Sequence, residues 1–178
     1  MTCIVGLLDS GKVWMGGDSA GVAGLDLMVR ADQKVFKNEP FIMGFTTSFR
    51  MGQLLRYSFV PPAKWEEIMD AYPFMVNDFI NAVRKCLKDG GYAKKEHEVE
   101  SGGDFLGGFK GRLFGINSDY QVGESCLGFL AIGCGSQIAL ESLFSTIGKP
   151  PEERVLISLK AAQAFSTGVR EPFVIDHL

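Results

Sequence analysis

The chain has 178 residues, of which 46% are hydrophobic and 22% charged, and its net charge is −3. These values are typical of one globular domain spanning residues 1–178. The lack of a lysine- and arginine-rich stripe argues against a nucleic-acid partner, which needs clustered cations for its phosphates. No apolar run is long enough to cross a bilayer, and the first residues lack the basic region of a signal peptide. We therefore expect no membrane partner and a cytoplasmic location.

The first part of the chain predicts strands. Residues 2–8 and 12–17 are apolar, and the short polar link between them indicates a hairpin. Both segments are continuously apolar rather than alternating, which favours a sheet covered on both faces. Residues 18–33 are rich in Gly, Ala and Asp and predict a loop with a short strand. Residues 34–37 and 41–46 predict two further strands around a turn.

Helices follow in the middle of the chain. Residues 51–59 predict a helix that two prolines end. In residues 72–89 the apolar side chains recur at three- and four-residue steps, so we expect a second, amphipathic helix ending at Gly90-Gly91. Residues 92–103 are charged and predict an exposed loop.

Strands return from residue 104, with a meander over 105–124 and a strand within 126–133. Ser136 is the expected N-cap of the next helix. Pro150-Pro151 opens a last helix, and residues 172–177 predict a short strand. The order of strands, two helices, strands, two helices and strand favours an α+β fold in which helix pairs cover two stacked sheets.

The start of the chain carries a candidate for catalysis. Thr2 directly follows Met1, and a small second residue permits removal of Met1. Thr2 would then hold a hydroxyl and a free α-amine on one residue, so that it could be its own nucleophile and base. Asp18 and Lys34 are an acid and a cation that could tune this chemistry. Their ordinary readings are a turn former and a surface lysine.

The cysteines and histidines of the chain give no sign of a metal site, a disulfide framework or a catalytic triad. The four cysteines lack C-x-x-C spacing and neighbouring histidines, so we expect no metal, no disulfide framework and no cofactor. Cys3 is a weak rival nucleophile, because its side chain should lie on the opposite face of the strand from Thr2. His97 and His177 are expected to be solvated surface residues, which argues against a Ser-His-Asp triad.

Short sequence pieces occur together in one order, and the chain resembles a known family through them. The pieces are T-x-I-V-G at 2–6, Gly-Lys-Val at 11–13, M-G-G-D at 15–18, Lys34-Val35, Gly44-Phe45 and A-I-G-C-G-S at 131–136. They resemble the proteasome-type N-terminal nucleophile hydrolases, closest to the bacterial proteolytic subunits that work with an ATP-driven unfoldase. The resemblance covers nearly the whole chain. It implies a four-layer αββα sandwich that assembles into rings around an enclosed chamber.

The resemblance also implies roles for five residues. Thr2 matches the nucleophile, Lys34 the lysine beside it, and Asp18 the acid that supports the lysine. Cys134 falls where the family usually has a serine near the terminal amine. Thr47 falls where the family has a glycine whose backbone N–H points at the oxyanion, although threonine disfavours a positive φ.

The chain departs from the family pattern in three places. The segment between Lys34 and Gly44 is slightly shorter, and residues 46–48 replace a glycine-rich turn. The family's Asp and Ser near the last helix have no clear match, and Ser166 and Glu171 are the candidates to replace them.

The resemblance implies a threonine peptidase subunit that hydrolyses peptide bonds of unfolded chains inside a homo-oligomeric chamber, with an ATP-driven unfoldase as a further partner. Two alternatives stay open: a catalytically silent ring or binding subunit of the same fold, and a small-molecule amidase. The state of Met1 separates the peptidase from the silent subunit, because an amide nitrogen cannot accept the hydroxyl proton. A closed ring separates the peptidase from the amidase.

Overall fold

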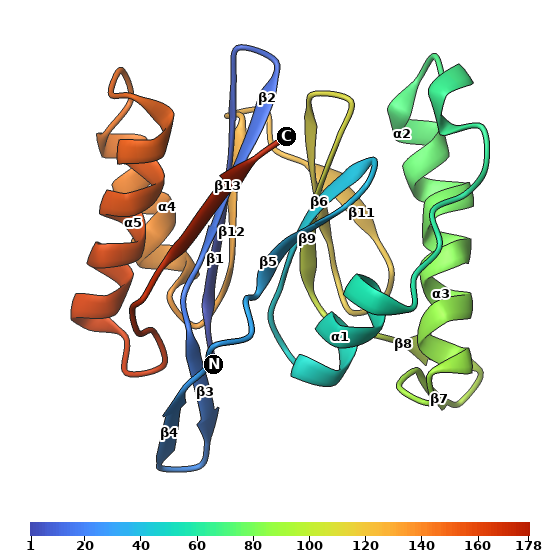
Figure 1. Ribbon diagram of the computed structural model, residues 1–178, viewed down its shortest axis with the longest axis horizontal. Helices are drawn as coiled ribbons and strands as arrows, with labels where there is room; N and C mark the ends of the chain where they lie inside the picture. Colours follow the sequence, from blue (N-terminus) through green and yellow to red (C-terminus); the bar gives the residue numbers. More distant parts are fainter.

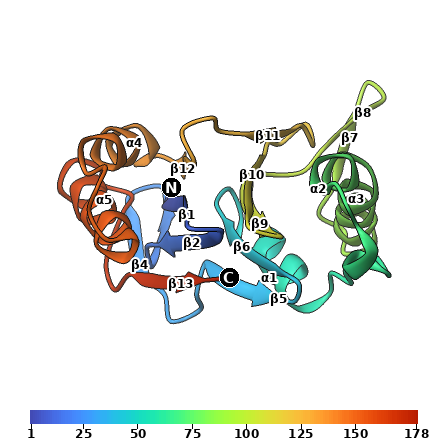
Figure 2. The ribbon, with the colours of Figure 1, turned by 90° about the horizontal axis from the view of Figure 1, so that it is seen from above.

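Two antiparallel sheets lie face to face in the middle of the molecule, and helices cover the outer side of each (Figures 1 and 2). The computed structural model describes all residues, 1–178. Its layers are helices, sheet, sheet and helices, which confirms the expected αββα sandwich. None of the helices combines the length and the hydrophobicity that crossing a lipid bilayer requires.

The first sheet contains strands from both the start and the end of the chain. Its strands, in spatial order, are β12 (Phe129–Gly133), β1 (Cys3–Asp9), β2 (Lys12–Gly17) and β13 (Val174–His177). β1 and β2 form the predicted hairpin, with Ile4 opposite Gly17 and Asp9 opposite Lys12. Helices α4 (Ser136–Ser145) and α5 (Pro151–Phe165) pack on its outer face.

The second sheet is built from the middle of the chain. Its strands, in spatial order, are β11 (Val122–Glu124), β10 (Arg112–Ile116), β9 (Phe105–Phe109), β6 (Phe41–Phe45) and β5 (Val35–Asn38). The helices outside it are α1 (Phe49–Tyr57), α2 (Ala71–Phe74) and α3 (Ile80–Asp89), with a π-helical turn, η2 (Met75–Phe79), joining α2 to α3. A short 3₁₀ turn, η1 (Trp65–Glu67), precedes α2.

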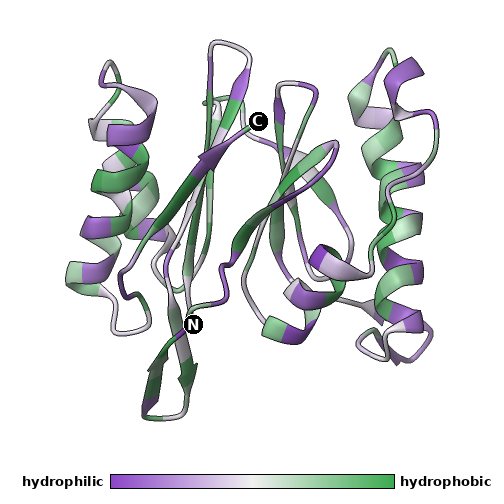
Figure 3. Cartoon of the chain, in the orientation of Figure 1, coloured by the Kyte–Doolittle hydropathy of each residue, from purple (hydrophilic) through white to green (hydrophobic).

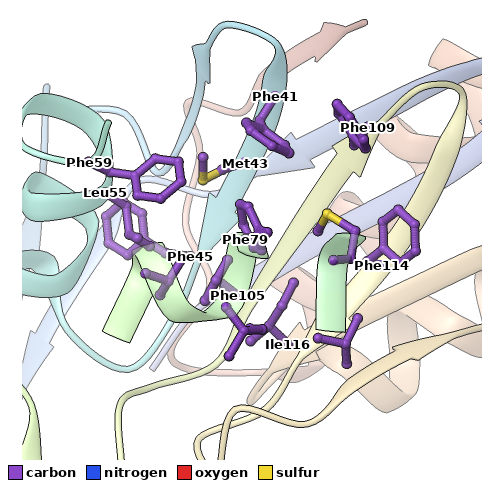
Figure 4. Packing of buried hydrophobic residues seen from close by; sticks show 14 of the residues in the cluster. Phe41, Met43, Phe45, Leu55, Phe59, Phe79, Phe105, Phe109, Phe114 and Ile116 are labelled. Carbon is purple, nitrogen blue, oxygen red and sulfur yellow. The ribbon is translucent and has the colours of Figure 1, made fainter. Parts of the chain in front are cut away.

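Three hydrophobic clusters fill the spaces between the four layers. The largest lies between the second sheet and its helices, and it holds nine of the 14 Phe residues, several of which are seen in Figure 4. Phe41 alone packs against Phe59, Phe74, Phe79 and Phe109. A smaller, mostly aliphatic cluster fills the space between the two sheets, and a third lies under α4 and α5. Since each sheet is covered on both faces, its strands are apolar on both sides.

Two segments form hairpins where the sequence predicts a loop with one short strand (18–33) and an exposed loop (92–103). Residues 18–33 contain β3 (Ala20–Ala23) and β4 (Asp26–Val29), and the charged segment 92–103 contains β7 (Lys94–Glu96) and β8 (Val99–Ser101). The turn between β7 and β8 uses positive φ values, 46° at His97 and 67° at Glu98, which suit the twist of a two-residue hairpin. Both hairpins are exposed and bury little, so hydrophobic patterning gives them no signal.

The expected N-cap at Ser136 is wrong. Gly135 occupies that position, and Ser136 is the first helical residue of α4. The chain passes so close to β1 and α5 here that a Cβ on residue 135 would lie 3.0 Å from the Cβ of Cys3 and 2.9 Å from that of Ala162. Packing therefore decides where α4 begins, and the preference of serine for the cap position does not.

Candidate functional site

The three N-terminal site residues come together where β1 begins. Thr2 precedes β1, Asp18 follows β2, and Lys34 precedes β5. The β1–β2 register, with Ile4 opposite Gly17, brings Thr2 beside Asp18. Each of the three residues is only 2% exposed. Buried acids and lysines are rare unless they are paired, so this arrangement needs a compensating partner for each charge.

Asp18 supplies that compensation, because its carboxylate is the acceptor for five groups. The donors are the Thr2 hydroxyl at 2.6 Å, the Lys34 ammonium at 2.8 Å, which is also an ion pair, and the backbone N–H groups of Cys3 at 3.0 Å, Ala20 at 2.9 Å and Arg170 at 3.2 Å. The carboxylate therefore ties β1, β3, β5 and the segment before β13 to one point. Its own side chain is fully buried.

Lys34 faces the nucleophile candidate directly. Its Nζ donates a hydrogen bond to Thr2 Oγ1 as well as to Asp18. Burial lowers the pKa of Lys34 below the ordinary value for lysine, and the negative charge of Asp18 opposes this shift. The site thus holds a compact cation beside a hydroxyl, in surroundings that make loss of its proton easier than in water.

The segment after β12 surrounds the backbone of Thr2. The Cys134 thiol donates to the Thr2 carbonyl with Sγ and O 3.4 Å apart, and the Gly135 N–H donates to the same oxygen at 3.3 Å. Ser166 follows α5, and its Oγ lies 3.2 Å from the Cys134 sulfur. Cys134 thus contacts Thr2, and Ser166 reaches Thr2 only through Cys134. Glu171 is not: its N–H donates to the side chain of Gln163.

Thr47 lies in the turn between β6 and α1 with φ at 65°, so the positive φ that threonine disfavours is present. Its Oγ1 accepts a hydrogen bond from the N–H of Asp104 at 3.1 Å, which helps hold this conformation. The Thr47 N–H has no acceptor within the chain. Both Thr2 and Thr47 line one cavity.

That cavity has a volume of about 280 Å³. Its lining comes from the chain start, from the β3–β4 hairpin, and from the segment that joins β6 to α1. The residues are Met1, Thr2, Gly21, Val22, Ala23, Met28, Arg30, Lys34, Phe45, Thr46, Thr47, Ser48 and Phe49. A bound molecule would therefore contact Thr2 together with polar and apolar side chains from these three segments.

The remaining reactive residues lie elsewhere or are inert. Cys3 packs under α4 and α5, and burial raises the pKa of its thiol to about 12, so it holds no thiolate near neutral pH. His97 is exposed, as expected. His177 is only partly exposed, because it stacks on Trp14 with ring centroids 4.5 Å apart, so the expectation of a solvated residue is wrong there. No group of three or more His, Cys, Asp or Glu side chains is arranged to hold a metal ion.

Sequence reasoning missed the backbone donors to Asp18 from Ala20 and Arg170, and it missed Arg30 and Phe49 in the cavity wall. A backbone N–H carries no residue-type signal. The wall residues are brought to Thr2 by the hairpin and by α1, neither of which a local pattern connects to the chain start.

Replacement of Asp18 by Ala should lower the free energy of unfolding by about 3 kcal/mol or more, because a buried ammonium loses its partner and three N–H groups lose their acceptor. Urea denaturation followed by circular dichroism measures this. The control is Asp89→Ala, which breaks the exposed pair with Lys85 and should cost less than about 1 kcal/mol. Losses of equal size in the two variants would contradict the structural role of Asp18.

Comparison with protein-family models and with curated protein sequences gives no match. Solved structures do match. The chain is similar to the Thiobacillus denitrificans BPH protein in complex with epoxomicin, with a TM-score of 0.80, 19% identity, and coverage of 99% of this chain and 98% of that one. It is similar to HslV from Trypanosoma brucei, with a TM-score of 0.69, 16% identity and 99% coverage of both chains.

The ancestral β-subunit Anbu from Yersinia bercovieri is also similar, with a TM-score of 0.69 and 16% identity over 99% of this chain and 81% of that one. At these identities the likeness concerns the arrangement of the chain in space. It agrees with the order of strands and helices and with the αββα layers described above. The chain has the fold of the proteasome-type N-terminal nucleophile hydrolases.

Proposed function

We propose that this chain is a threonine peptidase subunit whose nucleophile is Thr2 after removal of Met1. The observation that carries the proposal is the buried contact of the Thr2 hydroxyl with both Lys34 and Asp18 at the end of an open cavity. An ordinary second residue has no need of a buried ion pair. Such a pair is costly to bury, and functional sites are where such costs are found.

The reaction begins at the freed α-amine of Thr2. This amine, neutral in part because its ordinary pKa is roughly 7.7–8, takes the hydroxyl proton directly or through a water. Thr2 Oγ1 then attacks the carbonyl carbon of the substrate. The Lys34 ammonium lowers the pKa of the amine further by charge repulsion and stabilises the developing alkoxide. Asp18 keeps Lys34 in place.

Charge then develops on the substrate carbonyl oxygen. The free Thr47 N–H is the donor for this oxyanion, and one such donor is worth roughly 3–4 kcal/mol in acyl transfer. When the C–N bond breaks, the α-amine returns the proton to the leaving amine, and an ester remains on Thr2. Water, deprotonated by the same α-amine, hydrolyses the ester and restores the hydroxyl. While Met1 is attached, the nitrogen of Thr2 is an amide and accepts no proton.

Thr2→Ala should abolish hydrolysis of fluorogenic peptides, because it removes the attacking oxygen but leaves the fold intact. Intact-mass measurement should show that active protein begins at Thr2. Thr167→Ala, a substitution of the same kind in the loop after α5, is the matched control and should retain activity. Full activity in protein that retains Met1 would contradict the proposal. Protein that retains Met1 and hydrolyses no peptide would favour the silent subunit.

The similar structure that was solved in complex with epoxomicin suggests a second readout that needs no turnover. We expect epoxomicin to raise the melting temperature of the processed chain and to lose this effect in Thr2→Ala.

Lys34 sets the pH dependence. The rate should rise with pH as the α-amine loses its proton, and fall again as Lys34 loses its own. Since burial lowers the pKa of Lys34, this fall should begin below its ordinary pKa of 10.5. Lys34→Ala should lower kcat by roughly 100-fold or more, on the scale of losing a key electrostatic contact in an active site.

Lys34→Arg should not restore the rate, because a planar guanidinium does not fit the place of a compact ammonium in contact with both Thr2 and Asp18. Circular dichroism checks that both variants are folded. Near-normal kcat in either variant, or a pH profile without an alkaline fall, would exclude this role for Lys34.

The function includes assembly into a ring. Apolar side chains are exposed on the β3–β4 hairpin, where Figure 3 shows hydrophobic colour reaching the tip, and at the ends of α4 and α5. They are Leu25, Leu27, Met28, Val29, Phe144, Ile147 and Phe165. Exposed apolar surface of this kind favours association. A chamber would admit unfolded chains only, and an ATP-driven unfoldase could supply them.

Light scattering across a dilution series should therefore give a mass of many subunits, with activity on peptides and unfolded chains but not on folded proteins. Leu25→Ser in the exposed hairpin tip should shift the distribution to smaller particles, while Asp89→Ser on α3 should not. A mass of one subunit, unchanged at high concentration, would favour the small-molecule amidase.

A further inference from the structure

The cavity beside Thr2 has an unusual charge composition. Its lining contains two cations, Arg30 and Lys34, and no carboxylate. On composition alone it would attract an acidic side chain. A substrate whose carbonyl carbon lies at Thr2 would place the side chain of that same residue in this cavity, because Thr2 itself lines the cavity. The charge of the cavity therefore decides which peptide bonds are cut, and this inference rests on the proposed peptidase function.

Each of the two cations is paired with a carboxylate outside the cavity. Lys34 is paired with Asp18 at 2.8 Å. Arg30 makes two parallel hydrogen bonds to Asp32, from Nε to Oδ1 and from Nη2 to Oδ2, both 2.7 Å long. This two-point geometry is the strongest that arginine makes with a carboxylate. Asp32 does not line the cavity; it lines a second hollow that shares Arg30 and Phe45 with the first.

The Arg30 side chain is held in this position from three sides. The Asp32 carboxylate accepts hydrogen bonds from the Nε and Nη2 edge of the guanidinium. The guanidinium carbon lies 3.9 Å from the centroid of the Phe49 ring, so one flat face is stacked. Its stem lies against Gly21, where an added Cβ would meet Cδ at 2.8 Å. Held in this way, Arg30 presents its apolar stem and a neutralised head to the cavity.

The geometry points to Asp32 as a specificity-determining residue. Its carboxylate neutralises Arg30 from outside the cavity, so the cavity selects a substrate residue with an uncharged, apolar side chain at the attacked carbonyl. An acidic side chain finds no unpaired cation there. A basic one meets two cations and no free carboxylate. Val22, Met28, Phe45 and Phe49 supply apolar contacts for a side chain such as leucine or phenylalanine.

The test compares kcat/KM for three fluorogenic peptides that differ only in the residue before the cleaved bond, which is Leu, Glu or Lys. Protein that begins at Thr2 should cleave the Leu peptide at least about tenfold better than either charged peptide, the factor expected for a modest electrostatic and desolvation difference. Asp32→Asn keeps the shape and one acceptor but removes the charge. It should raise the ratio of Glu to Leu cleavage about tenfold.

Two control variants make the result specific to the Arg30–Asp32 pair. The double variant Asp32→Asn/Arg30→Met should lose the gain, because methionine keeps an apolar stem without the cation. Asp89→Asn makes the same change of charge on a remote exposed pair and should leave the ratio unchanged. A ratio cancels any common effect on Thr2, so altered nucleophile strength cannot mimic the outcome. Circular dichroism verifies that the variants are folded.

The outcomes separate the two proposals. If the processed chain cleaves the Glu peptide as well as the Leu peptide, or if Asp32→Asn leaves the ratio unchanged, the inference about Asp32 is wrong while the peptidase function stands. If the processed chain cleaves none of the three peptides and epoxomicin has no effect on its melting temperature, the peptidase function is wrong and the inference is overturned with it.

Discussion

One buried carboxylate determines how the ends of several elements meet in this protein. Asp18 accepts hydrogen bonds from the Thr2 hydroxyl, from Lys34, and from N–H groups on three separate segments. Because an ionised acid away from water is costly, the fold must bring enough donors to it. The position of β1 relative to β3, β5 and the segment before β13 follows from this requirement. The same donors fix the side chains that face the cavity.

The charges of the site are arranged in neutral pairs, each with one member facing the cavity and the other behind it. Lys34 has Asp18 behind it, and Arg30 has Asp32. The two pairs differ in burial. The first is almost fully buried, and its role is to place an ammonium at Thr2, where water does not screen it. The second is partly exposed, so its charges are screened by water, and the role proposed for it is selectivity.

The hydrophobic clusters explain why such a polar site can be held rigidly. Both sheets are covered on both faces, so the strands that carry Thr2, Asp18 and Lys34 are anchored by packing along their lengths. The aromatic cluster under α1 to α3 holds the turn that carries Thr47 and Phe49, and Phe49 itself packs against it. Displacement of this turn, which carries the oxyanion donor in the proposed function, would therefore require rearrangement of close-packed aromatic rings.

The sequence by itself determined the succession of strands and helices, because long apolar and amphipathic segments carry a periodic signal. It also pointed to Thr2, Asp18 and Lys34 through short ordered motifs, and the structure places these three in contact. Only the tertiary structure decided the two exposed hairpins, the Gly135 cap of α4 and the pairing of Arg30 with Asp32 under Phe49. The reason is physical: close approach and backbone donation, such as that from Arg170 to Asp18 across 152 positions, depend on distance in space and leave no trace in residue type or local period.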